Sequence, residues 1–176
     1  VTVMFTDFKN FTRIAEGISP EELIAMLDDC FRLFDSIVKK YGLEKIKTIG
    51  DAYMVAGGIP FPRPHHAEAI AEMAIAMREE VDCINQDYNT SIRIRIGIST
   101  GPVVAGIIGR RKFAYDLWGE TVNLACRMES TGEAGKIQVA AAVYERLKGK
   151  YQFEMKHLIN VKGHGDLTAY WLGEGV

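Results

Sequence analysis

The chain has 176 residues, 48% of them hydrophobic and 25% charged, a composition typical of a globular protein with one sizeable core. Its formal net charge of −2 argues against a general nucleic-acid binder, which would be clearly basic, and no apolar run approaches the length of a membrane-spanning helix. We therefore expect a single domain over residues 1–176 that works in the cytoplasm. Because Val1 starts inside an apolar run, we also expect a fragment of a longer protein with regulatory domains.

The N-terminal region combines a buried strand with a long helix. Residues 1–6, VTVMFT, predict a strand that delivers Asp7 at its end. Residues 8–12 form a polar and aromatic turn that should open a helix, whose free backbone N–H groups would suit a phosphate. A capping box with proline at the first helical position, Ser19-Pro20-Glu21-Glu22, then begins a long helix that ends at Gly42.

A β-hairpin is predicted next. Residues 45–49 and 52–56 are rich in β-branched and aromatic side chains, and Gly50-Asp51 lies between them as a tight turn. This places Asp51 at the hairpin tip, and Lys47 faces along the same hairpin. Aspartate is also a common turn residue, so the segment alone does not distinguish a functional site from an ordinary hairpin.

The C-terminal half continues the mixture of helices and strands. Four isoleucines alternate with polar or small residues over residues 92–99, which indicates a half-buried strand. A helix is predicted over residues 120–131, with Asn123 and Arg127 on one face because they are four residues apart. Because several strands are joined by tight turns, we expect an α+β fold with a mostly antiparallel sheet and helices on one face. The other predicted elements are a helix at 67–85, strands at 103–108, 113–118 and 137–139, a helix at 141–147, and strands at 151–154 and 167–172.

Two aspartates suggest a metal site. If the strands that carry Asp7 and Asp51 pair, the two carboxylates lie side by side close to a helix N-terminus. Magnesium that carries a triphosphate prefers one or two carboxylates together with phosphate oxygens. On spacing alone, two unrelated aspartates at strand ends would explain the pattern equally well.

Five motifs then resemble the catalytic domain of class III nucleotidyl cyclases, of the adenylyl cyclase type. They occur in the family's order and span nearly the whole chain, so chance agreement is negligible. The resemblance implies a ferredoxin-like α+β catalytic fold and a head-to-tail homodimer with active sites at the interface. The motifs are FTDFKNFT (5–12), KTIGDAYM (47–54), RIGISTGP (95–102), YDLWGETVNLACRM (115–128) and VKGHG (161–165).

The resemblance also implies a role for each matching residue. Two Mg²⁺ or Mn²⁺ ions per active site would be held by Asp7, Asp51 and the backbone carbonyl of Phe8. The phosphates would be bound by backbone amides around Asn10, Phe11 and Thr12, by Arg95, and by Lys162 of the partner subunit. Asn123 and Arg127 would orient the ribose and stabilise the transition state. His164 stands where the family often has lysine, which weakens one possible phosphate contact.

The positions that read the purine base in this family fall on Lys47 and Asp116. An ammonium group can donate to the ring nitrogen of adenine, and a carboxylate can accept from its exocyclic amine, whereas guanine presents the opposite pattern. ATP is therefore the expected substrate, with cyclic AMP and pyrophosphate as products of an intramolecular phosphoryl transfer. No side chain is an obvious general base, so the metal, a phosphate oxygen or water could take the proton.

Two classes of alternative remain. A guanylyl or pyrimidine cyclase would share the motifs and differ in the base. A catalytically silent dimerisation module would share the fold, but it would lack either the metal set or the Asn/Arg pair, and this chain has both. A diguanylate cyclase or polymerase palm could share paired carboxylates, but it has no place for the Asn-x-x-x-Arg helix.

Overall fold

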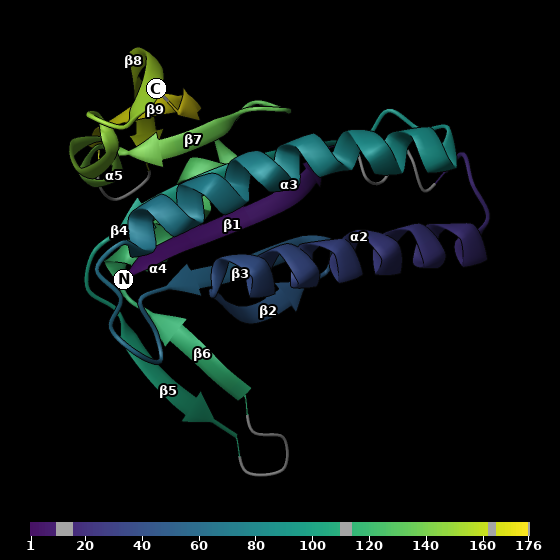
Figure 1. Ribbon diagram of the computed structural model, residues 1–176, viewed down its shortest axis with the longest axis horizontal. Helices are drawn as coiled ribbons and strands as arrows, with labels where there is room; N and C mark the ends of the chain where they lie inside the picture. Colours follow the sequence, from purple (N-terminus) through teal and green to yellow (C-terminus); the bar gives the residue numbers. More distant parts are fainter. Residues whose placement is uncertain (10–15, 110–113, 162–164, 176) are drawn as a thin grey trace.

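The computed structural model describes residues 1–9, 16–109, 114–161 and 165–175. Its helices and strands alternate along the chain, as Figure 1 shows. In chain order they are β1 (Thr2–Lys9), α2 (Pro20–Tyr41), β2 (Glu44–Ile49), β3 (Ala52–Gly57), α3 (His66–Tyr88), β4 (Arg93–Thr100), β5 (Val104–Ile108), β6 (Ala114–Trp118), α4 (Glu120–Ser130), β7 (Ile137–Ala140), α5 (Ala141–Leu147), β8 (Tyr151–Val161) and β9 (Gly165–Gly175).

One sheet organises most of these elements. Its seven strands lie in the order β2-β3-β1-β4-β7-β9-β8, and every neighbouring pair is antiparallel except β4 and β7, which are parallel. The expected α+β fold with a mainly antiparallel sheet is confirmed. Strands β5 and β6 form a separate antiparallel ribbon that extends away from the body of the molecule (Figure 1).

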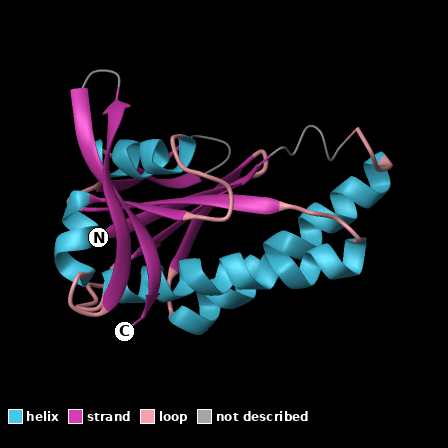
Figure 2. Cartoon of the chain, turned by 90° about the horizontal axis from the view of Figure 1, so that it is seen from above, coloured by secondary structure: helices cyan, strands magenta, loops and turns pink. Residues whose placement is uncertain are grey.

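Helices cover both faces of the sheet, so the expectation of helices on one face was wrong. Met4 and Phe8 of β1 belong to the large core beneath α2 and α3, whereas Val3 and Phe5 belong to a smaller core that includes Ala125 of α4. The reason is that β1 carries apolar side chains on both faces of the sheet, so both faces must be covered by other elements. Figure 2 shows helices on either side of the strands.

The predicted ends of α2 and the predicted hairpin that follows it are confirmed by the structure. Helix α2 begins at the predicted capping box: the hydroxyl of Ser19 accepts from the backbone N–H of Glu22 at 3.2 Å, and the Glu22 carboxylate accepts from the N–H of Ser19 at 3.0 Å. It ends at Gly42, whose φ of 64° is in the left-handed region that favours glycine. Strands β2 and β3 pair as predicted, which confirms the hairpin around Asp51.

Strand lengths were predicted less well. Strand β1 does not end before Asp7 but continues to Lys9, because it pairs with β4 along its whole length, as far as the Lys9–Arg93 pair. Phe8 and Lys9 are therefore strand residues and not the start of a turn, while residues 10–12 lie outside the described residues. Strands β8 and β9 are also longer than predicted. In the described residues, every helix is too short or too polar to cross a lipid bilayer.

Candidate active site

Most of the predicted site residues lie on the side of the sheet that α4 covers. Asp7 of β1 and Arg95 of β4 are directly paired in register. Because Met4 and Phe8 face α2 and α3, Asp7, at an odd-numbered position, points to the opposite side. Asp51 lies in the turn between β2 and β3, and the pairing of Thr6 with Tyr53 brings that turn beside the Asp7 end of β1.

The carboxyl group of Asp7 comes close enough to Asp51 to perturb its titration. The pKa of Asp51 is raised from its ordinary value, first by burial and then by the negative charge of Asp7. A divalent cation between two such carboxylates would remove both penalties, so the residues fit the metal that the motifs imply. Among the described residues no cluster of three or more His, Cys, Asp or Glu side chains is suited to a metal, and the third protein ligand that the motifs imply is the backbone carbonyl of Phe8.

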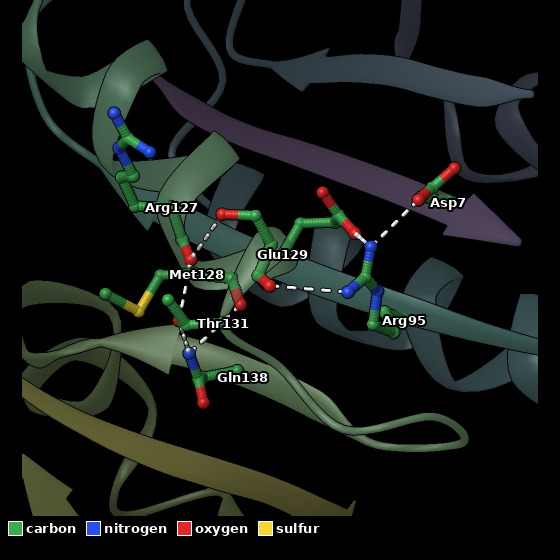
Figure 3. Close-up of polar contacts among 8 residues, drawn as sticks. Asp7, Arg95, Arg127, Met128, Glu129, Thr131 and Gln138 are labelled. Atoms are coloured by element: carbon green, nitrogen blue, oxygen red, sulfur yellow. Dashed lines mark hydrogen bonds and ion pairs between the residues drawn. The ribbon is translucent and has the colours of Figure 1, made fainter. Parts of the chain in front are cut away.

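Arg95 is the centre of a small charged cluster next to these aspartates (Figure 3). Its Nη2 lies 2.9 Å from Oδ2 of Asp7 and 2.9 Å from Oε1 of Glu129, and its Nη1 donates to the carbonyl of Ser130 at 3.3 Å. Only 16% of the Arg95 side chain is exposed. The predicted phosphate-binding arginine therefore binds two carboxylates of its own chain in this structure.

Glu129 is the member of this cluster that the sequence did not reveal. It is only 7% exposed, and its pKa is raised to about 7, because burial and the charges of Asp7 and Asp51 outweigh the stabilising effect of Arg95. A signal did exist in the sequence: Glu129 is four residues after Ala125 and so lies on the buried stripe of α4. An acidic residue on such a stripe requires a partner inside the protein.

Helix α4 approaches β4 closely because residue 97 is glycine. A Cβ atom built on Gly97 would lie 2.0 Å from the backbone nitrogen of Glu129 and 2.5 Å from the carbonyl oxygen of Ala125. Real side-chain atoms never come so near to backbone atoms. Gly97 thus brings Glu129 to within reach of Arg95, which is two residues away on the same strand.

The two predicted base-reading residues contact each other. The ammonium group of Lys47 on β2 donates to Oδ2 of Asp116 on β6, and the side chains are 38% and 17% exposed, respectively. Oδ1 of Asp116 accepts from the backbone N–H of Leu117 at 2.8 Å, which fixes the orientation of the carboxylate. The structure therefore brings together a donor and an acceptor from segments that are distant in sequence.

The structure does not bring all the predicted residues together. Asn123 and Arg127 are exposed on α4, and within the described part of the chain neither forms a side-chain hydrogen bond or ion pair with the groups above. Figure 3 shows Arg127 directed away from Arg95 and Asp7. Phe8 buries its ring against Phe34, with 6.1 Å between the ring centroids, which anchors the backbone beside Asp7. Asn10, Phe11, Thr12 and Lys162 lie outside the described residues.

Comparison with known proteins gives a consistent result. The family model for the adenylate and guanylate cyclase catalytic domain matches residues 1–174. A curated adenylate cyclase from Mycobacterium tuberculosis is 44% identical over 171 residues, which are 97% of this chain but only 39% of that protein.

Solved structures with both nucleotide specificities are similar to this chain. The guanylate cyclase domain of RhGC from Catenaria anguillulae, solved in complex with GTP, has a TM-score of 0.95 and 38% identity, covering 99% of this chain and 96% of its own. The adenylyl cyclase CyaB from P. aeruginosa has a TM-score of 0.94 and 32% identity, covering 98% of this chain and 93% of its own.

Proposed function

This chain belongs to the family of adenylate and guanylate cyclase catalytic domains, and on that premise we propose that it converts ATP to 3',5'-cyclic AMP and pyrophosphate. The observation that carries this choice of nucleotide is the contact between Lys47 and Asp116. A base that enters between them must offer an acceptor to the ammonium group and a donor to the carboxylate. Adenine offers both, through a ring nitrogen and its exocyclic amine.

Guanine would leave the same two groups poorly matched. In the pose proposed for adenine, its carbonyl oxygen would face the carboxylate of Asp116 and its ring N–H would face the ammonium group of Lys47. A site built to hydrogen-bond one base rejects another because buried polar groups are then left unpaired, at about 1–3 kcal/mol for each group. The second candidate, guanylyl cyclase activity, is favoured by similarity to guanylyl cyclases, among them the Catenaria anguillulae domain and the Guanylate cyclase 32E of Drosophila melanogaster, which is 39% identical over 177 residues.

The proposed reaction is an in-line displacement within one substrate molecule. The ribose 3'-oxygen forms a bond to the α-phosphorus, the bond from that phosphorus to the bridging oxygen of the β-phosphate breaks, and pyrophosphate leaves with the electron pair. The proton of the 3'-hydroxyl passes to a phosphate oxygen or to water. Because little covalent chemistry is asked of the protein, its contribution is orientation and charge stabilisation.

Each group of site residues has a part in that reaction. Asp7, Asp51 and the backbone carbonyl of Phe8 would hold two Mg²⁺ or Mn²⁺ ions, which would supply charge neutralisation and a more acidic 3'-hydroxyl. Arg95 would bind the phosphates, together with the backbone at Asn10, Phe11 and Thr12 and with Lys162 of the partner subunit. Asn123 would orient the ribose, and Arg127 would stabilise charge on the transferring phosphoryl group.

The separation of Asn123 and Arg127 from the aspartates supports a site shared between two copies of the chain. The β5–β6 ribbon also supports a homodimer, because its apolar side chains are exposed although they extend over two adjacent strands. A second copy of the chain would cover them. The exposed apolar residues of the ribbon are Val104, Ile107, Ile108 and Trp118.

We further propose that residues 1–176 form one cytoplasmic catalytic domain of a longer protein that has regulatory domains and is either soluble or membrane-anchored. The support is that one family model matches residues 1–174 while the chain spans only 39% of its mycobacterial relative. The presence of the metal set and the Asn/Arg pair in the same chain supports an active enzyme over a silent dimerisation module.

The experiment that tests the choice of nucleotide is a turnover assay with ATP, GTP, CTP and UTP, each with Mg²⁺ and with Mn²⁺. We expect cyclic AMP as the main product. The double variant Lys47→Glu/Asp116→Cys should raise the ratio of kcat/KM for GTP to that for ATP, and each single variant should raise it less. A wild-type preference for GTP, or an unchanged ratio in a folded double variant, would contradict the proposal.

A further inference from the structure

Arg95 has two carboxylate partners in this structure, and one of them is a proposed metal ligand. Its Nη2 is shared between Asp7 and Glu129 at equal distances of 2.9 Å. A carboxylate that holds a guanidinium group offers less charge and fewer free lone pairs to a metal. Binding of a cation to Asp7 therefore competes with the Asp7–Arg95 pair.

Two buried atoms show that the present arrangement is not the best that Arg95 can make. Nε of Arg95 and Oε1 of Glu129 are both buried and have no hydrogen-bond partner in the described residues. Oε1 lies near Nη2 as an ion pair, but not in the direction of a hydrogen bond. A rotation of the guanidinium away from Asp7 and toward Glu129 would give both atoms a partner. Because unpaired buried polar atoms are costly, pairing these two atoms would offset part of the free energy of leaving Asp7.

Glu129 is held where that second arrangement needs it. The close packing of α4 on Gly97 places the backbone of Glu129 directly over β4, and burial leaves its carboxyl group with Arg95 as its cationic neighbour. The carbonyl of Ser130, the next residue, already accepts from Nη1 of Arg95. The end of α4 thus offers Arg95 a complete alternative to Asp7 (Figure 3).

We infer that Glu129 is a positioning residue that takes Arg95 from Asp7 when a divalent cation binds, so that Asp7 is free for the metal and Arg95 is held ready for the phosphates of the nucleotide. This inference rests on the proposed function, because it takes Asp7 as a metal ligand. Glu129 itself touches neither metal nor substrate. Its effect passes through Arg95.

The test measures Mn²⁺ binding without nucleotide, by electron paramagnetic resonance of the free ion, in a cycle of variants. Glu129→Gln keeps the shape of the side chain but removes its charge, so Arg95 should stay on Asp7 and the Mn²⁺ affinity should fall about fivefold or more. In the Arg95→Gln background the same change should have little effect, because there is no guanidinium to relocate. Glu133→Gln removes an exposed acid just beyond α4 and should leave the affinity unchanged.

Nucleotide kinetics and folding complete the test. Glu129→Gln should raise the KM for ATP. Glu129→Asp keeps the charge and should recover part of the Mn²⁺ affinity. The aspartate variant also replaces the glutamine variant in the test if the latter does not fold. An equal loss of affinity in the wild-type and Arg95→Gln backgrounds, or no loss in either, would overturn the inference. The proposed function is tested separately from the role of Glu129. It would be contradicted by Mn²⁺ binding that survives Asp51→Asn, or by wild-type protein that makes no cyclic AMP.

Discussion

Replacing Gly97 with alanine should displace α4 and lower the activity more than it lowers the stability of the fold. The added Cβ would lie 2.0 Å from the nitrogen and 2.6 Å from the Cα of Glu129. Ordinary contacts of this kind are no shorter than about 3.4 Å, so the helix must move by roughly 1–1.5 Å. Backbone atoms of a packed helix cannot rotate aside as a flexible side chain can.

The expected cost follows from that displacement. Overpacking of a well-packed interior destabilises a protein by about 1–3 kcal/mol. Alanine also lowers the conformational entropy of the unfolded chain relative to glycine, and this offsets about 0.4–1 kcal/mol of the destabilisation. Catalysis should suffer more than stability, because α4 carries Asn123, Arg127 and Glu129, and a misplacement of about 1 Å can lower a rate about 100-fold.

The measurements are urea denaturation followed by circular dichroism, and turnover of ATP at saturating metal. Gly149→Ala is a suitable control, because a Cβ at that position meets no atom within 4 Å and the residue lies outside the strands and helices. The control should unfold at or slightly above the wild-type midpoint and keep its activity. A Gly97→Ala protein with wild-type stability and activity would refute the claim that α4 requires glycine at this position.

Three further predictions concern charges at the site. Asp51→Ala should lower turnover at least 100-fold without lowering the urea midpoint, because it removes a proposed metal ligand and also the repulsion with Asp7; activity within tenfold of wild type would argue against the metal assignment. Mixing inactive Asp7→Ala chains with inactive Arg127→Ala chains should restore activity if each site is shared by two subunits, whereas no recovery despite subunit exchange shown by a tagged pull-down would argue for a site within one chain. The pKa of Glu129 is raised to about 7 in the folded state, so folding favours its protonated form; without metal, the stability of wild type relative to Glu129→Gln should fall by up to about 3 kcal/mol as pH rises from 4.5 to 7.5, and parallel pH profiles would contradict this.

The parts of the structure that local signals determine could be predicted from the sequence. The capping box of α2, the left-handed Gly42 and the hairpin around Asp51 each depend on a few neighbouring residues, and all were found where they were expected. The family and its fold followed from motifs that span the chain, and the comparisons confirm both. The structure brings Lys47 and Asp116 into contact, while their role in reading the base stays a prediction.

Features that depend on packing between distant segments were missed. The true end of β1 is set by its pairing with β4, which a pattern within β1 does not contain. The close approach of α4 to β4 depends on the absence of a side chain at Gly97, which a pattern within α4 does not contain. Glu129 was missed for the same reason, because its partner Arg95 becomes visible only when α4 is placed over β4.

The division of the apolar interior into two unequal parts has an evolutionary consequence. Of the proposed site residues, the large core between the sheet and helices α2 and α3 contains only the ring of Phe8, whereas the small core includes residues of β1, β6 and α4, which carry Asp7, Asp116 and Asn123. Substitutions that alter chemistry on the α4 side therefore have little effect on the part of the folding free energy that comes from the large core on the other side. A protein built in this way can exchange one nucleobase preference for another through a few tolerated changes, and lineages with different second messengers can descend from one scaffold.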